Sequence, residues 1–429
     1  MLTPFIQAFK TPDLRRKIIF TLAILAVFRF GSQVPTPGVD VSAVRTCVDL
    51  VQGSGVYGML NMFTGGALLQ LAVFALGIMP YITASIIMQL LRVVIPRLEM
   101  LYKEGQAGQT KITQYTRYLT IGLAILQSTT IISMARSGAL FPNCPEEIIP
   151  DDSVYTTVFM IITMTAGTAM IMWLGELITD RGVGNGMSLL IFTQIIATFP
   201  SSLWQIQVTQ GWVIFTIVTA VGLVVVTAVV FVELSQRRIP VQYAKRMVGR
   251  RMYGGSSTYI PLKINQAGVI PVIFASSLLY VPLLLSQFNT GSAWATWIER
   301  HFVDGSHPLY MATFFLLTVF FTFFYVSITF NPVDVADNMK RYGGFIPGIR
   351  AGRPTAEYLD YVLTRLTSAG ANYLGLVAMI PLVAFVLVGA NQNFPFGGTS
   401  ILIMVGVGLN TIQQIEGQLQ QRNYEGFLR

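Results

Sequence analysis

Ten apolar stretches of membrane-spanning length run through the sequence, and they limit its fold more than any other feature. Because about 20 apolar residues carry a helix across a bilayer, each stretch is a candidate transmembrane helix. Charged residues make up only 11% of the 429 residues, against about 25% in soluble domains. The stretches lie at 18–31, 72–92, 117–135, 154–174, 186–200, 212–232, 267–286, 309–330, 367–388 and 399–415. The sequence therefore predicts an all-α integral membrane protein with ten transmembrane helices.

Lysine and arginine are distributed very unevenly between the two sides of these spans. With the N-terminus inside, the inside segments hold 24 of the 28 basic residues and the outside loops hold 3; the remaining one, Arg29, lies in the first span. Short cytoplasmic loops are the basic ones in membrane proteins. We therefore expect a multi-pass protein of the cytoplasmic membrane, with both termini in the cytoplasm.

Ten spans divide into two halves of five at a loop near residues 200–211, which predicts domains at 1–205 and 206–429. Because five is an odd number, two halves of similar fold would be inverted relative to each other. Inverted repeats place a working site near the bilayer midplane, between the halves. The expected fold is therefore two inverted, pseudo-symmetric halves.

One uncharged segment of 32 residues, 60–91, is too long for a single span and is interrupted by glycines and a proline. Such breaks are tolerated at membrane depth only where protein or a water-filled cavity satisfies the backbone. We therefore expect about 57–69 to form a short re-entrant helix that enters from the outside. The remainder, about 74–91, is expected to be one helical span of roughly 27 Å.

The spans lack the residues that membrane enzymes and ion-coupled transporters need. Both histidines, His301 and His307, fall in one outside loop, and no zinc-protease, Walker or nucleophile-elbow motif occurs. Spans two to ten hold almost no ionisable residue in their central portions, whereas ion-coupled transporters usually carry one. We therefore expect no enzymatic activity, no metal and no cofactor. A secondary transporter with inverted repeats and an insertase that binds helices without a pore are the alternative functions.

Two inside loops, 233–266 and 331–365, are much longer than a connection between spans requires, and they mix Arg and Lys with Tyr, Phe, Ile and Pro. Attraction to anionic lipids explains the charge of such loops. It does not explain their length or their aromatic content. Arginine with aromatic residues is typical of a docking surface for a protein or for ribosomal RNA phosphate. We therefore expect a large macromolecular partner on the cytoplasmic side.

Cys47 and Cys144 both fall in loops expected outside, where the environment permits a disulfide. Two independent free thiols and one disulfide are both compatible with the sequence.

Several long motifs, in order along the chain, closely resemble the SecY family of bacterial protein-translocation channels. They are ALGIMPYITASIIMQLL (75–91), KEGQAGQTKITQYTRY (103–118), MWLGELITDRGVGNGMS (172–188), QRRIPVQYAKR (236–246), PLKINQAGVIPVIFASS (261–277), GGFIPGIR (343–350) and FGGTSILI (396–403). The loop sequence at 237–255 resembles those of actinobacterial members of the family. The resemblance covers essentially the whole chain.

The resemblance implies a protein-conducting channel with ten helices in two halves. Such a channel passes unfolded secretory preproteins across the membrane and releases apolar segments sideways into lipid. Signal sequences would be recognised as apolar helices. The implied partners are the SecE and SecG subunits, the SecA ATPase, a translating ribosome and the anionic lipids of the membrane.

A channel for unfolded chains needs a narrow hydrophobic constriction, because such a constriction dewets when empty and blocks ions. Ile78 and Ile82 are four residues apart and would share one helix face. By resemblance, a pore ring would be formed by Ile78, Ile82, Ile191, Ile273 and Ile403, with Leu278 as a sixth member.

The resemblance also assigns a plug, a lateral gate and a docking site. The plug is the re-entrant segment and includes Tyr57, Leu60, Asn61, Phe63, Gly65 and Gly66. The gate lies between spans two and seven, where Gln89 and Asn265 would belong to the polar contact that closes it and Val281 would occupy a gate position. The motor or the ribosome would engage Arg250, Arg251 and Arg350.

Overall fold

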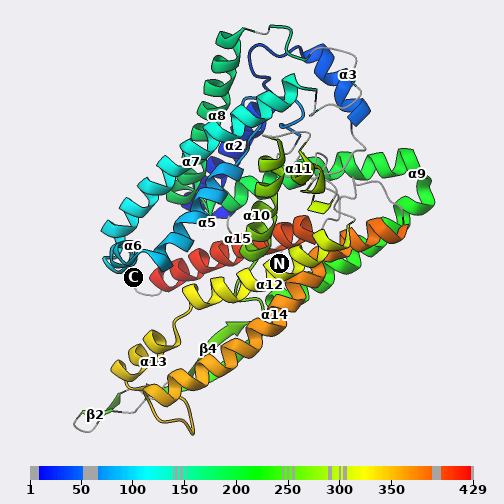
Figure 1. The fold of residues 1–429 in the computed structure, drawn as a ribbon. Helices are drawn as coiled ribbons and strands as arrows, with labels where there is room; N and C mark the ends of the chain where they lie inside the picture. Colours follow the sequence, from blue (N-terminus) through cyan, green and yellow to red (C-terminus); the bar gives the residue numbers. More distant parts are fainter. Residues whose placement is uncertain are drawn as a thin grey trace.

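The computed structural model describes residues 9–51, 66–138, 140, 144, 148–151, 153–243, 246–248, 251–253, 257–287, 292–298, 301–302, 307–388 and 398–426. Helices form most of this part of the chain (Figure 1). They are α2 (Pro12–Gly31), α3 (Val41–Val51), α5 (Met79–Val94), α6 (Pro96–Lys103), α7 (Gln106–Arg136), α8 (Val154–Arg181), α9 (Gly186–Leu234), α10 (Ile270–Gln287), α11 (Ala293–Ile298), α12 (Pro308–Thr329), α13 (Pro332–Arg341), α14 (Arg353–Val388) and α15 (Gly398–Gly426).

Each of the ten apolar stretches overlaps a helix of the structure. In the part of the chain that the structure describes, five helices are long and apolar enough to cross a membrane. They are Gln106–Arg136, Val154–Arg181, Gly186–Val208, Gly211–Leu234 and Pro308–Arg341. The pair α5 and α6, bent by 101°, gives a sixth if it is one span. The chain is therefore a mostly helical membrane protein, and the number ten stays a prediction.

The helix α9 contains two of these spans. Gly211 interrupts it with a left-handed backbone (φ 84°), which glycine adopts without the steric cost of a side chain. The Asn185 side chain begins the helix by accepting hydrogen bonds from the backbone N–H groups of Met187 and Ser188. The break lies close to the expected boundary between the two halves, and that division into domains stays a prediction.

The expected helical span over 74–91 is wrong at its start. Residues 66–78 form turns, and the helix α5 begins only at Met79. Pro80 lies in the first turn of α5, where its missing N–H costs no hydrogen bond. Before it, Gly77 has a φ of +56°, and the backbone N–H of Val73 donates to the carbonyl of Val34. Contacts to distant residues therefore hold these apolar residues outside the helix.

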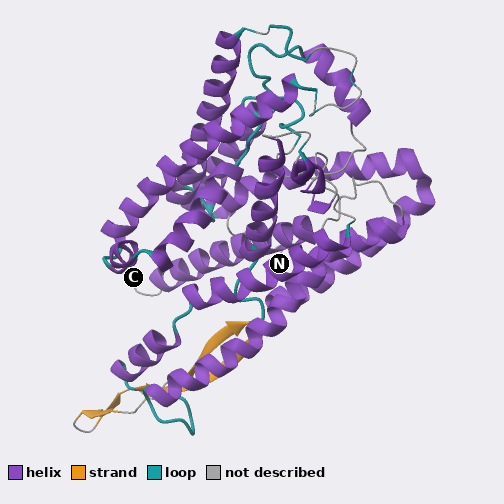
Figure 2. Cartoon of the chain, viewed as in Figure 1, coloured by secondary structure: helices purple, strands orange, loops and turns teal. Residues whose placement is uncertain are grey.

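A small β-arm extends from one end of the helices (Figure 2). Its sheet has the order β4-β1-β5 and joins β1 (Gln236–Tyr243) antiparallel to both β4 (Ser257–Lys263) and β5 (Gly344–Phe345). A second ladder pairs β2 (Arg246–Val248) with β3 (Arg251–Tyr253). Buried side chains of β1 and β4 pack on α14, which stabilises the arm against that helix. They are Ile239, Val241 and Leu262, against Leu359 and Val362.

Cys47 and Cys144 form a disulfide, which resolves the pairing that the sequence left open. Their Cα atoms lie 5.5 Å apart, and the bond ties α3 to the connection between α7 and α8. Cys47 is fully buried in an apolar cluster that includes Leu71, Ile132 and Met160. The bond therefore reinforces a packed region formed by elements distant in sequence.

Candidate functional site: an apolar constriction

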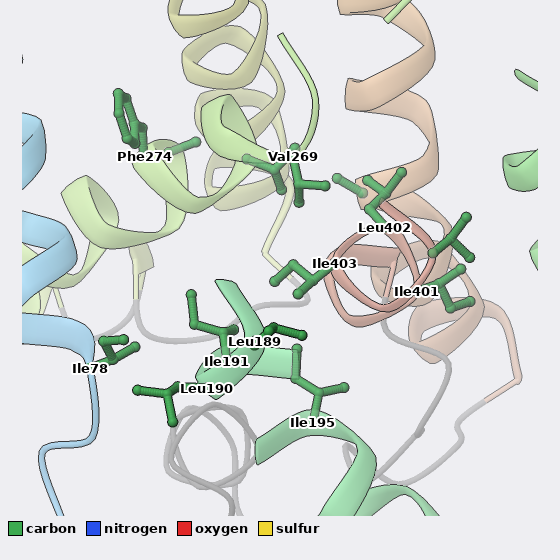
Figure 3. Packing of buried hydrophobic residues seen from close by; sticks show 14 of the residues in the cluster. Ile78, Leu189, Leu190, Ile191, Ile195, Val269, Phe274, Ile401, Leu402 and Ile403 are labelled. Carbon is green, nitrogen blue, oxygen red and sulfur yellow. The ribbon is translucent and has the colours of Figure 1, made fainter. Parts of the chain in front are cut away.

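Isoleucines from distant parts of the chain meet in the largest apolar cluster of the structure (Figure 3). Ile78 precedes α5, Ile191 lies on α9 and Ile403 lies on α15; their exposed fractions are only 2%, 7% and 1%. Ile82 and Ile273 are partly buried and pack against the same cluster. Five of the six residues expected in the pore ring therefore belong to one apolar core.

Glycines allow the elements around this cluster to approach closely. A Cβ added to Gly77 would lie 2.8 Å from the Nε2 atom of Gln194, so the backbone before Ile78 fits against α9. A Cβ added to Gly406 would lie 2.8 Å from a methyl group of Val269, so α15 fits against the start of α10. These two glycines therefore allow the segment before α5 to pack on α9, and α15 to pack on the start of α10.

Leu278 does not join the cluster, in contrast to the expectation from the resemblance. Its side chain is 46% exposed, whereas Leu279 is 6% exposed and belongs to the cluster. Val272, Ala275 and Leu279 follow the i, i+3, i+7 spacing of one helix face. Five positions separate Leu278 from Ile273, which puts the two on different faces of α10.

Gln194 is a polar neighbour of the constriction that the motifs did not reveal. It is 1% exposed and lies beside Gly77, and neither its Nε2 nor its Oε1 atom has a hydrogen-bond partner among the described residues. A single glutamine in an otherwise apolar span is the signal that could have identified it. Such an amide is costly to bury without a hydrogen-bond partner.

The polar contact expected between Gln89 and Asn265 is absent from the described residues. The Gln89 amide donates to Ser85 on its own helix at 3.5 Å, and Asn265 instead donates to Glu233 at 2.5 Å and to the Gly268 carbonyl at 3.1 Å. The helices α5 and α10 still pack against each other. The structure therefore puts Asn265 in a contact with α9 in place of one with α5. The Val281 position lies on α10, and its side chain lies outside the described residues.

Two of the three expected docking residues, Arg251 and Arg350, lie on or beside the β-arm. Arg350 is exposed in the connection that leads to α14, and its carbonyl accepts a hydrogen bond from Thr355. Arg251 begins β3, while its side chain and all of Arg250 lie outside the described residues. Two arginines stack on exposed tyrosine rings. The guanidinium carbon of Arg238 lies 4.9 Å from the ring centroid of Tyr259, and that of Arg365 lies 4.6 Å from the ring centroid of Tyr361.

The expected plug lies almost entirely outside the described residues, which resume at Gly66. That glycine is in a turn with a φ of +89°. Tyr57, Leu60, Asn61, Phe63 and Gly65 are among the residues that the structure does not describe. Within the described ranges, no three His, Cys, Asp or Glu side chains lie close enough to share a metal ion.

Comparisons with known proteins agree with the motifs. A family model described as SecY matches residues 72–412. The "Protein translocase subunit SecY" of Streptomyces scabiei is 66% identical over 437 residues, which cover 100% of both chains. This similarity to a Streptomyces protein also agrees with the actinobacterial style of the loops.

Two solved structures share the fold. One, described as "The structure of a protein conducting channel", has a TM-score of 0.64 at 19% identity and covers 93% of this chain and 91% of its own. Another, described as "Sec61 in the Canine ribosome-channel complex from the endoplasmic reticulum", has a TM-score of 0.62 at 18% identity, with coverage of 93% and 91%. The similarity of sequence and of fold extends over nearly the whole length, and the chain belongs to the SecY family.

Proposed function

We propose that this chain is the protein-conducting subunit of a translocase, which passes unfolded secretory proteins across a membrane and releases apolar segments into lipid. One observation carries the proposal: isoleucines from four separate elements meet in one apolar cluster, in a chain of the SecY family. Its relative in Streptomyces scabiei is a translocase subunit by name.

The isoleucine cluster acts as the seal of the channel. An apolar constriction dewets when it is empty, so it blocks ions without a selective site. β-Branched side chains have few rotamers, and they form a compact wall that separates when a polypeptide enters. Ile78, Ile82, Ile191, Ile273 and Ile403 form this wall.

The sideways exit lies between α5 and α10, which pack together beside the seal. A signal sequence is an apolar helix, and it can replace the contacts of α10 with its own. Gln89 and Asn265 have different partners in this structure, Ser85 and Glu233, so the packed gate is held by contacts other than a bond between the two. Val281 lines a later part of the same seam.

The segment that holds Tyr57–Gly66 is the plug that closes the outer funnel. Arg250, Arg251 and Arg350 engage the motor, because arginine makes two-pronged contacts to carboxylate or phosphate. The motor is the SecA ATPase or a translating ribosome, and the Sec61 structure is one of a ribosome-channel complex by description. SecE and SecG complete the complex.

The β-arm faces the cytoplasm, and so do both termini, because 24 basic residues lie on that side and 3 on the other. The membrane is then the cytoplasmic membrane. The disulfide between Cys47 and Cys144 supports this orientation, since it lies on the side where oxidation is permitted.

A secondary transporter is not favoured. Such transporters bind their coupled ion at charged groups near the bilayer midplane. Among the described residues, Glu233 is the only charged side chain that is nearly fully buried, and it lies in the last turn of α9. The largest cluster of buried side chains among the described residues is instead apolar.

The test is to arrest a secretory precursor midway and to crosslink it from a photoreactive probe at Ile82. A channel gives crosslinks between the precursor and this position. A probe at Leu278, which is outside the cluster, is the matched control and is expected to label weakly. Crosslinks confined to probes in the β-arm would contradict a pore through the cluster.

A further inference from the structure

Glu233 is an unusual residue for its place in the fold. It lies in the last turn of an apolar membrane-spanning helix, the second half of α9, and is only 8% exposed. Burying a carboxylate is costly unless a partner compensates for the lost hydration. Its one hydrogen-bond partner among the described residues is the side-chain amide of Asn265, at 2.5 Å. The proposed channel mechanism makes no use of this pair.

Asn265 uses both of its amide hydrogens. One is donated to Glu233 and the other to the carbonyl of Gly268, at 3.1 Å, just before α10 begins at Ile270. Because both neighbours are acceptors, the amide nitrogen must face them. A backbone bond from the Ile264 N–H to the Ser235 carbonyl joins the same two segments, at 3.1 Å. The side chain of Asn265 thus links the end of α9 to the residues directly before α10.

The residues that follow Gly268 in the chain belong to the apolar seal. The carbonyl of Val269 accepts from the N–H groups of Val272 and Ile273, which starts α10. Val269 and Val272 are buried in the isoleucine cluster, and Ile273 packs against it. The position of Gly268 therefore decides where these three side chains enter the seal.

Buried hydrogen-bonding groups without a partner among the described residues lie around this link between α9 and α10. A Cβ added to Gly370 of α14 would lie 2.6 Å from the Ile264 carbonyl, so α14 contacts this connection closely. Thr367 and Tyr373 lie about one turn on either side of Gly370. Their hydroxyl groups, and the Oδ1 atom of Asn265, are buried without a partner among the described residues. Buried polar groups are normally paired. The hydroxyl groups of Thr367 and Tyr373 are therefore candidates to form new hydrogen bonds when α10 moves.

We propose, on the basis of the channel function proposed above, that Glu233 is a positioning residue for the gate helix. Through Asn265 it holds the start of α10 so that Val269 and Ile273 complete the apolar seal. When a signal sequence draws α10 away, this bond breaks, and the spare hydroxyl groups of α14 receive the freed amide. The closed state of the channel depends on the acceptor oxygen of Glu233 more than on its charge.

Two substitutions separate the acceptor from the charge. Glu233→Gln keeps the shape and one acceptor oxygen and removes the charge, whereas Glu233→Met keeps the approximate size and removes the acceptor. The loss of a hydrogen bond to a charged group, with the amide of Asn265 left buried, corresponds to about a ten- to hundredfold shift from closed to open. We expect that shift in Glu233→Met, with Glu233→Gln close to the wild type.

The experiment uses the full chain with its partner subunits in proteoliposomes and measures two quantities. One is the efflux of chloride from resting vesicles, and the other is hydrogen exchange at the backbone of residues 264–273. Glu233→Met should leak and exchange faster, and Glu233→Gln should do neither. The proposal would be overturned if residues 264–273 exchanged at the wild-type rate in Glu233→Met, or if the two variants leaked chloride equally.

A double substitution keeps the test decisive if Glu233→Met does not accumulate. Asn265→Asp alone places two carboxylates in contact and is expected to leak. Combining it with Glu233→Gln reverses donor and acceptor, so the pair bonds again and part of the seal returns. No recovery in the double variant would count against a positioning role. A wild-type complex that passes no preprotein would instead refute the channel function, and the exchange comparison would still be readable.

Discussion

Truncation of Ile403 tests the seal most directly. Its side chain is 1% exposed and belongs to the cluster, so Ile403→Ala removes three buried carbon groups from the closed state. At about 0.8 kcal/mol per carbon group, with a further contribution from the cavity, the closed state loses about 2–4 kcal/mol. Where the elements have separated in the open state, the same carbons contact little and their loss matters less. If about 2 kcal/mol of the loss falls on contacts across the constriction, the closed-to-open ratio drops about thirtyfold.

The assay is the conductance of the resting complex in planar lipid bilayers, without motor or precursor. Ile403→Ala should show frequent channel openings, and the wild type should show few. Leu278→Ala is the matched control, because Leu278 is 46% exposed and outside the cluster. Ile403→Ala without added conductance, in a complex that retains its disulfide, would refute the seal. Equal leaks in both variants would do so as well.

Three further perturbations address other regions. Arg350→Glu reverses the charge of an exposed docking residue, so motor-driven export should be lost while the complex stays folded in the membrane; near-normal export into vesicles would exclude the assignment. Cys47→Ser opens a link across 97 residues and should destabilise the outer cluster by about 2–4 kcal/mol, seen as a lower Tm that reductant no longer changes. The pKa of Asp151 is held below its usual range by hydrogen bonds, first from the Thr156 hydroxyl and then from the Ser153 N–H. Its contribution is therefore present above the unfolded-state pKa and lost as the pH falls through the folded-state pKa. Asp151→Asn should flatten the acid limb of the Tm–pH curve; an unchanged limb would contradict this.

Local chemistry made much of the fold predictable. In lipid, each backbone polar group needs a partner within its own segment, so a long apolar stretch must be helical wherever it spans. The stretches at 117–135 and 154–174 accordingly lie within α7 and α8. The same reasoning failed over residues 74–78, which are apolar and yet form turns. The preceding Val73 is bonded to Val34 and Gly77 packs on Gln194, and no local pattern reveals such long-range contacts.

The candidate site divides in the same way. The motifs identified five isoleucines that the structure gathers into one cluster. Helical periodicity could have identified Leu279, and not Leu278, as the residue that joins the cluster, because Val272, Ala275 and Leu279 share one face of α10. No periodicity could have identified the partner of Asn265, since an amide bonds to whichever acceptor the packing brings within reach. Glu233 became that acceptor because β1 and β4 return the chain from the end of α9 to the start of α10.

The sequence alone determined that this chain is a helical membrane protein of the SecY family, because apolar length, basic loops and long ordered motifs are properties of the chain itself. The tertiary structure decided which apolar residues meet, whether the two cysteines pair and which polar groups stay unpaired. Those outcomes depend on distances between segments far apart in sequence, and only packing sets such distances. The seal is therefore a property of the assembled helices, and any one of its isoleucines by itself is an ordinary residue of an apolar helix.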